Sequence, residues 1–308
     1  MALTNWLPTP KFEDYKEFFK EHFEMERRED GVLFVCMHTL GGEVQWNAQL
    51  HRAIWQLFRT IGSDPENEVL IFTAKGGNWM RGFDTESWAE IEEPTAGGDQ
   101  KRATYENMFY DGRNMLISLI HDIEFPTICA FPGFGFHAEI GLMMDIAIAS
   151  NDAIILDDHF GYGLVPGDGI HSCFMELAGL RRGTYAMWMG KMIDAKTALD
   201  WGMISEIVPK EKLIERAYEI ADRLMSKPRH TRRMTTQVFR RRWKQRIVDD
   251  LDGAFGMEMY VDLAVNERHT DEKAEEIIQA RGDELAFLKE GRKDGMKFKR
   301  EDNGSGVR

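Results

Sequence analysis

The first half of the chain alternates short apolar runs with amphipathic segments. The runs GVLFVCMHTL, EVLIFTAKGG, FPTICAFPGF and DAIILDD have the length and composition of strands, and several run into a glycine turn. Between them, NAQLHRAIWQLFRTIG places Leu50, Ile54, Leu57 and Ile61 on one helical face. Strands that alternate with helices require crossover connections, so this pattern predicts a layered α/β fold.

The second half of the chain, from about residue 171, has the pattern of helices. Residues 11–28 also carry apolar side chains at helical spacing and predict a short amphipathic helix. The basic run RHTRRMTTQVFRRRWKQR predicts a helix face that pairs with acidic neighbours. We expect four parts: an N-terminal helical extension (1–24), an α/β core (25–225), a helical region (226–269) and a charged tail (270–308).

The charge balance limits the classes of partner. The chain has 39 basic and 52 acidic residues, and this net charge of −13 argues against a nucleic acid or an anionic membrane as its main partner. The scattered cysteines Cys36, Cys129 and Cys173 indicate free thiols in a reducing compartment. We see neither a signal-peptide pattern nor the roughly 20 apolar residues of a membrane helix. We therefore expect a cytoplasmic protein.

Titratable side chains are concentrated in DDHFGYGLVPGDGIH, residues 157–171, a glycine-rich loop that follows an apolar run. Loops carry function more often than cores do, so this segment is the first place to look for a site. Single histidines are more often structural than catalytic. Several histidines stand in unusual contexts near acids or glycine turns, namely His51, His137, His159 and His171.

Three kinds of chemistry fit this loop poorly. Asp168 and His171 do not have a recognised zinc-ligand spacing. GYGLVPG lacks the dinucleotide-binding spacing, and Pro166 breaks the helix start that a nucleotide loop needs. No GxSxG sequence occurs, and Cys173 lies beyond the loop. What remains is a His/Asp pair that acts as acid and base on water or on a carbon acid.

The order of three segments carries a family resemblance. EVLIFTAKGGNWMRGFD, FPTICAFPGFGFHAEIGLMMDIAIASNDAIILDDHFGYGLVPGDG and AMWMGKMIDAKTALDWGMISEIV resemble the crotonase (enoyl-CoA hydratase/isomerase) superfamily, over roughly residues 25–265. The resemblance implies a crotonase-like spiral of ββα units with a helical C-terminal region. It also implies a homotrimer or a dimer of trimers, with residues 226–269 as the trimerisation region.

Two departures from the CoA-dependent hydratases narrow the resemblance. Those enzymes carry a triple-glycine turn that supports the thioester oxyanion, and a catalytic Glu four residues before the glycine of a G-x-x-P turn. Here Gly163 and Pro166 fit that turn, but His159 stands where the Glu belongs, and FHAE brings His137 to the glycine turn. The chain is similar instead to a small branch of β-diketone hydrolases, of the 6-oxocamphor hydrolase type, which cleave cyclic β-diketones by a retro-Claisen reaction without CoA.

The resemblance to this branch implies a role for each matched residue. His159 takes a proton from water while Asp168 orients it, and His137 hydrogen-bonds a substrate carbonyl. Other matched positions hold water or the second carbonyl, namely His51 and Glu258. The substrate-binding positions are Trp46, which shapes an apolar pocket, Arg81, near which backbone N–H groups add a donor, and Glu139, whose role is secondary.

The resemblance implies no cofactor and no metal, and a small cyclic diketone as the partner. An enzyme that acts on a CoA thioester is the alternative, and a non-catalytic subunit is a third possibility. Structural interpretations also stand beside the functional ones. Asp168 fits the N-cap of a helix after PGDG, and Glu258 fits an acid at the edge of the core.

Overall fold

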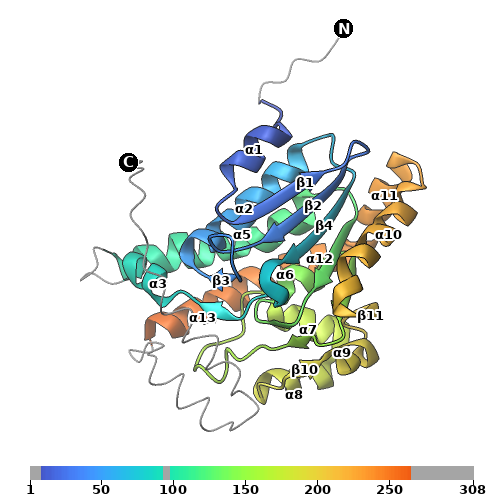
Figure 1. Cartoon of the computed structure of the whole chain (residues 1–308). Coiled ribbons are helices and arrows are strands. Elements are labelled where there is room, and N and C mark those ends of the chain that lie inside the picture. Colours follow the sequence, from blue (N-terminus) through green and yellow to red (C-terminus); the bar gives the residue numbers. More distant parts are fainter. Residues whose placement is uncertain (1–7, 93–97, 265–308) are drawn as a thin grey trace.

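The computed structural model describes residues 8–92 and 98–264 (Figure 1). Its largest sheet has the strand order β1-β2-β4-β6-β8-β11, in which β1 is antiparallel to β2 and the other neighbours are parallel. Strand β4 is buried along its whole length, as is typical of a parallel sheet covered on both faces. The strands are β1 (Phe23–Arg27), β2 (Val32–Met37), β4 (Val69–Ala74), β6 (Thr127–Phe131), β8 (Ile146–Ser150) and β11 (Glu206–Val208).

Each of the strands β2, β4, β6 and β8 is followed in the chain by a short strand that leaves the large sheet. The short strands form two small sheets, β3-β5 and β10-β9-β7. This succession of strand pairs and helices confirms the predicted α/β fold with crotonase-like ββα units. The short strands are β3 (Gln45–Trp46), β5 (Gly82–Phe83), β7 (Phe134–Gly135), β9 (Ile154–Ile155) and β10 (Ile193–Asp194).

Helices cover both faces of the large sheet (Figure 1). On one face, α10 packs Leu213, Ala217 and Ala221 against Val69 and Ile128. The opposite face packs on the main core, to which α2 and α5 contribute. The helices of the core are α2 (Ala48–Ser63), α3 (Thr85–Glu92), α4 (Gln100–Arg102), η3 (Ala103–Tyr110), α5 (Asp111–Ile117), η4 (Ser118–Asp122), α6 (Glu139–Leu142), α7 (Ile170–Ala178), α8 (Leu180–Trp188), α9 (Ala195–Trp201) and α10 (Leu213–Met225).

The C-terminal region is helical, as expected, and continues to the last described residue. It comprises α11 (Arg229–Phe239), α12 (Arg241–Arg246), η6 (Ile247–Leu251) and α13 (Asp252–Ala264). Two short strands, β10 and β11, interrupt the stretch between residue 171 and this region, which the sequence pattern assigned to helices alone. The expected charged tail, 270–308, lies outside the described residues.

The N-terminal prediction was wrong in part. Helix α1 (Phe12–Phe18) forms within the expected segment 11–28, but the chain then enters β1. In β1, Phe23 and Met25 are buried while Glu24 and Glu26 are exposed. This period of two is short, and the helical spacing of the preceding phenylalanines obscured it. Strand β1 therefore crosses the expected boundary between residues 24 and 25.

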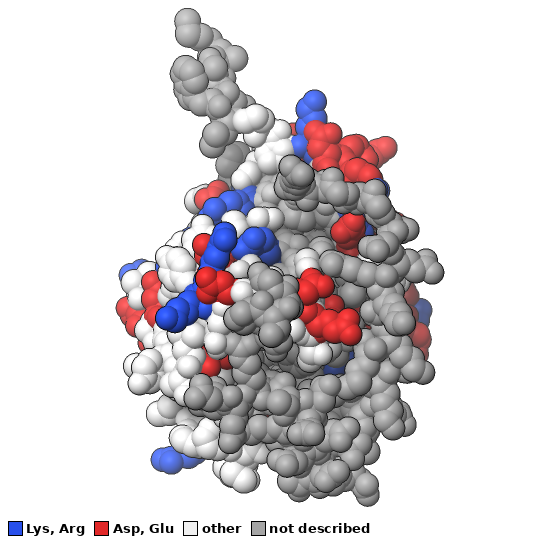
Figure 2. Space-filling model, turned by 90° about the vertical axis from the view of Figure 1, so that its left-hand side faces the viewer, with Lys and Arg blue, Asp and Glu red and all other residues white. Residues whose placement is uncertain are grey.

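The basic run of α11 and α12 pairs with acidic side chains, as predicted. Arg240, 1 % exposed, bonds to Asp145 at 2.6 and 2.8 Å and also reaches backbone carbonyls that precede β6. Figure 2 shows the α3 side of the molecule, away from α11, and on that face Lys and Arg also lie next to Asp and Glu among the residues it describes. The other described ion pairs of the run are Arg229 and Arg232 with Glu68, Arg242 and Arg246 with Glu176, and Arg246 with Asp250.

Within residues 8–92 and 98–264, every helix is too short or too polar to cross a lipid bilayer.

Candidate active site

His159 lies on the loop that follows β9 and contacts an acid two residues before it. Its Nδ1 is 2.6 Å from Oδ2 of Asp157, whose side chain is buried. A carboxylate on Nδ1 fixes the ring so that Nε2 is the free nitrogen. The backbone of the loop closes tightly here, because Leu164 N–H donates to the His159 carbonyl at 2.8 Å. His159 is therefore held both by its side chain and by its main chain.

Two further acids face the other side of the His159 ring. Nε2 is 3.7 Å from Oδ2 of Asp168 and 3.7 Å from Oε1 of Glu258. These separations exceed a direct hydrogen bond. Nε2 and the two carboxylate oxygens lie within 4.8 Å of one another, a spacing that one water molecule can bridge by hydrogen bonds. The three side chains are mostly buried, at 18 %, 10 % and 7 % exposure.

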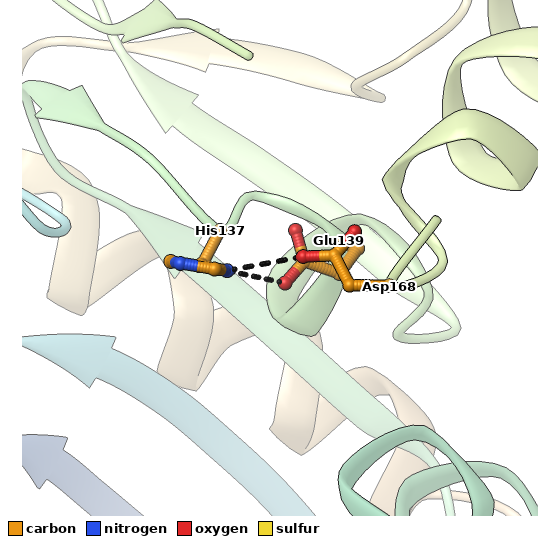
Figure 3. Close-up of side chains that lie close together, drawn as sticks. All are labelled: His137, Glu139 and Asp168. Atoms are coloured by element: carbon orange, nitrogen blue, oxygen red, sulfur yellow. Dashed lines mark hydrogen bonds and ion pairs between the residues drawn. The ribbon is translucent and has the colours of Figure 1, made fainter. Parts of the chain in front are cut away.

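His137 occupies a strained turn between β7 and α6. Its backbone has φ of 47°, in the left-handed region that non-glycine residues rarely adopt. Its Nδ1 lies 3.1 Å from Oε1 of Glu139 and 3.4 Å from Oδ2 of Asp168, and both contacts are drawn in Figure 3. Since Nδ1 serves the two carboxylates, Nε2 is the nitrogen left for another partner.

Carboxylates raise the pKa of both central histidines. Burial opposes the charge on His137, but Glu139 and Asp168 outweigh it and raise its pKa to about 9. Burial likewise opposes the charge on His159, but Asp157, Asp168 and Glu258 raise its pKa well above the usual value. At neutral pH the resting site therefore favours two imidazolium rings.

We refer to His137, Glu139, His159, Asp168 and Glu258 as the polar cluster. The pKa values of its acids are shifted in opposite directions. Burial alone would raise the pKa of Asp168, but His159 and His137 hold it below its usual range. Burial raises the pKa of Glu258 to about 8. Burial and the charge of Asp168 also raise the pKa of Glu139. The cluster thus holds an ionised acid, Asp168, beside a protonated one, Glu258.

Glu258 reaches these histidines from α13 and also bonds to the loop that carries Asp168. Its Oε2 accepts a hydrogen bond of 2.9 Å from Gly167 N–H. Asp168, the next residue, accepts from Ile170 N–H through Oδ1, while its Oδ2 faces the histidines; the N-cap of α7 is Gly169. Asp168 therefore lies near both central histidines, but it stands one residue before the N-cap position that the sequence predicted for it.

Aromatic rings border the cluster on the side of β3 and α2. The Trp46 ring stacks on His137 with centroids 4.0 Å apart. His51 meets Trp46 edge-on at 5.0 Å and Trp88 at 5.5 Å. Burial, and then the charge on His137, lower the pKa of His51 to about 3, so this histidine is neutral.

Arg81 lies on the segment next to the His137 turn. The preceding residue, Met80, bridges to Gly135, and its carbonyl accepts from Phe136 N–H at 3.1 Å. The structure thus brings the backbone of this segment beside His137, as expected. The role of the Arg81 side chain stays a prediction.

The sequence assigned the wrong partner to His159. Asp168 was expected to orient this histidine, but it lies nearer to His137, and Asp157 makes the short contact. Asp157 was not among the predicted site residues. Its spacing of two from His159 was an available signal, because alternate residues of an extended segment point to the same side. Trp88 was also missed, and no motif marks it.

Two groups of side chains have the donor types of a metal site: His137, Glu139 and Asp168, and His159, Asp168 and Glu258. A histidine must offer a lone pair to bind a metal ion. The raised pKa values of His137 and His159 favour their protonated forms instead. A metal ion would therefore have to displace these protons, and the absence of a metal stays a prediction.

Comparisons with known proteins agree on the fold. The family model for enoyl-CoA hydratase/isomerase matches residues 29–270. The hydroxycinnamoyl-CoA hydratase-lyase of Pseudomonas fluorescens is 25 % identical over 201 residues, which cover 65 % of this chain and 71 % of that protein. An enoyl-CoA hydratase/isomerase from Mycobacterium paratuberculosis matches in structure, with a TM-score of 0.71, 18 % identity, and 83 % and 97 % of the two chains covered.

A further structural match is a β-diketone hydrolase from the cyanobacterium Anabaena sp. PCC 7120, solved bound to (S)-3-oxocyclohexyl acetic acid. It is 30 % identical to this chain, with a TM-score of 0.74, and the match covers 82 % of this chain and 98 % of that one.

Proposed function

The chain belongs to the enoyl-CoA hydratase/isomerase family, and on this premise we propose that it is a hydrolase that cleaves a carbon–carbon bond of a cyclic β-diketone to give a keto acid. The observation that carries the proposal is the pair His159–Asp157, in which His159 turns its other nitrogen, Nε2, toward Asp168 and Glu258. The similarity to the Anabaena β-diketone hydrolase supports it.

The first step is the attack of water on one carbonyl carbon. In its neutral form, His159 accepts a proton from water at Nε2, while Asp157 stabilises the imidazolium that forms. The oxygen of the attacked carbonyl gains negative charge. His137 donates to it through Nε2–H, since its Nδ1 is engaged by Glu139 and Asp168.

The second step breaks the bond between the attacked carbon and the carbon between the two carbonyls. The electron pair of that bond leaves as the enolate of the second ketone, and the attacked carbon becomes a carboxylic acid. The enolate takes a proton from His159, which returns to its neutral form, or from Glu258, whose raised pKa keeps it protonated near neutral pH and which then regains a proton from His159. The sum is diketone plus water to keto acid.

The test is hydrolysis of a defined probe. The ligand of the Anabaena enzyme holds one ketone and one acid, as expected of a cleaved bicyclic β-diketone. We would incubate the protein with the bicyclic β-diketone that hydrolyses to 3-oxocyclohexyl acetic acid, in water enriched in heavy oxygen. The expected result is a keto acid labelled in its carboxyl group. Absence of product from this probe and from a panel of other cyclic β-diketones would overturn the proposal.

The CoA-dependent relatives define the alternative outcome. If the chain acts on a thioester, CoA esters should raise its Tm and be turned over, while cyclic diketones do neither. We propose instead that diketones raise the Tm and that CoA esters leave it unchanged. A non-catalytic subunit would turn over neither class, and His159→Ala would leave its ligand binding unchanged.

We also propose that the protein assembles as a homotrimer or a dimer of trimers through the region 226–269. Large apolar side chains of its described part are exposed, which supports an interface there. They are Met234, Val238, Phe239, Val248, Met257, Tyr260 and Leu263. Light scattering of the full chain tests the proposal: a mass of three or six chains is expected, and a monomer would contradict it.

A further inference from the structure

Trp46 makes its closest ring contact with a residue of the polar cluster, not with an apolar one. Its indole stacks on the imidazole of His137 with centroids 4.0 Å apart and planes at 25°. The indole is 5 % exposed, so the ring has little surface left to line an open pocket. This contact differs from the role in an apolar pocket that the sequence indicated for Trp46.

The backbone around Trp46 is fixed from several directions. Strand β3 pairs with β5, with Trp46 opposite Phe83. The Trp46 carbonyl accepts from Asp84 N–H at 3.0 Å and from Trp88 Nε1–H at 3.3 Å. His51 then meets the indole edge-on. The position of the Trp46 indole is therefore fixed. His137 lies in a turn with positive φ, and the orientation of its ring depends on the neighbouring side chains.

Orientation matters because the two nitrogens of His137 have different tasks. Nδ1 faces Glu139 and Asp168, and the Nε2–H is the donor that the proposed reaction needs. If the His137 imidazole rotated about the bond that joins it to Cβ, Nε2 would move away from the carbonyl of a bound substrate. A flat aromatic face at stacking distance permits one ring plane and opposes the others.

We infer that Trp46 is a positioning residue that acts through His137: the stacked indole sets the plane of the imidazolium and favours its charged form by a cation–π contact. The inference rests on the proposed function in one respect: the proposed substrate provides the carbonyl to which His137 Nε2–H donates. On this inference, Trp46 orients His137 and keeps it protonated, and it does not determine the size of a substrate pocket.

The expected size of the effect follows from the cation–π contact. A cation–π contact changes the proton affinity of the ring by roughly three- to thirtyfold, with the larger values for contacts removed from water. Loss of the indole should therefore lower the pKa of His137 by about half a unit to one and a half units. Other titratable groups around His137 also affect its pKa, and they are unchanged in the Trp46 variants. They are Glu139 on α6, Asp168 before α7, His51 on α2, His159 after β9 and Glu258 on α13.

The experiment is a pH titration of carbon-labelled histidine in the full chain by NMR, without substrate. The His137 signal is assigned by its loss in His137→Gln. Trp46→Leu should shift the titration to lower pH, while Trp46→Phe, which keeps an aromatic face, should retain most of the wild-type value. Trp88→Phe is the matched control, because that ring contacts Trp46 and His51 and should leave His137 nearly unchanged.

Two results would overturn the inference. In the first, Trp46→Leu remains folded by circular dichroism and leaves the His137 titration unchanged. In the second, Trp46→Leu raises KM for larger diketones more than for smaller ones, with kcat and its pH profile unaltered, as a pocket wall would. The NMR titration needs no turnover, so failure of the proposed function and failure of this inference are distinguishable. If Trp46→Leu does not fold, Trp46→Phe against Trp46→Met provides the comparison, because only Phe keeps an aromatic face.

Discussion

Asp157 Oδ2 lies 2.6 Å from His159 Nδ1, closer than any other acid described around that ring. The pair therefore has the arrangement in which a carboxylate holds the tautomer of a base and stabilises the imidazolium that forms. Asp168, which the sequence placed in this role, approaches the opposite nitrogen instead.

Asp157→Asn should lower kcat by about 10²- to 10⁴-fold, because an amide can hold His159 in the wrong tautomer and leaves the imidazolium without its counter-charge. The measurement is the rate of keto acid formation at saturating diketone. Asp158→Asn, the same change one residue on, should cost less than about tenfold. Equal losses in the two variants would show that the segment, rather than the contact with His159, is what matters.

The pH dependence of kcat/KM should be bell-shaped and centred above neutral pH. The rising limb reports His159, which is a base only when neutral, and its raised pKa moves that limb upward. The falling limb reports His137, which loses its second proton as pH rises through about 9. His137→Gln keeps a donor that does not titrate, so we expect roughly 10- to 10³-fold lower kcat without that falling limb. A falling limb that persists in His137→Gln would assign it to another group.

Much of the fold was predictable from local patterns. The alternation of apolar runs and amphipathic segments is strong in α2 and β4, where burial follows the pattern closely. Strand β1 escaped because a short period-two pattern followed directly on a helical one. Strand β9 proved shorter than DAIILDD, since Asp157 and Asp158 leave the sheet and turn toward the loop.

The site was predictable in its members but less so in its contacts. His137, His159, Asp168 and Glu258 are brought together from separate elements, as the family resemblance implied. Which acid contacts which nitrogen depends on the path of the loop and on the docking of α13. Neither is encoded in residue spacing, and this is why Asp157 and the stacking of Trp46 became visible only in the structure.

Glu258→Gln should raise stability above neutral pH. Burial raises the pKa of Glu258 in the folded protein to about 8, whereas an unfolded chain ionises Glu near pH ~4.3. Between these values the folded state binds the extra proton, so its stability falls as pH rises. Gln removes that penalty and can still accept from Gly167 N–H. We expect the Tm difference, Gln minus Glu, to be near zero at about pH 4 and roughly 2–6 °C at about pH 9. A difference that does not depend on pH would contradict the raised pKa.

Gly167→Ala should reduce activity by displacing Glu258. A Cβ on Gly167 would lie 2.2 Å from the carbonyl oxygen of Ala254, one turn before Glu258 on α13. Since backbone cannot yield cheaply, the loop and α13 must separate, and the 2.9 Å bond from Gly167 N–H to Glu258 must lengthen. We expect kcat to fall by about tenfold or more, with a stability loss of about 1–3 kcal/mol. The matched control is Gly253→Ala on the same helix, where a Cβ meets nothing within 4 Å and should stabilise the helix by up to about 1 kcal/mol. If Gly167→Ala keeps wild-type kcat while Tm falls, the contact between loop and helix serves stability, and Glu258 needs no such fixed position.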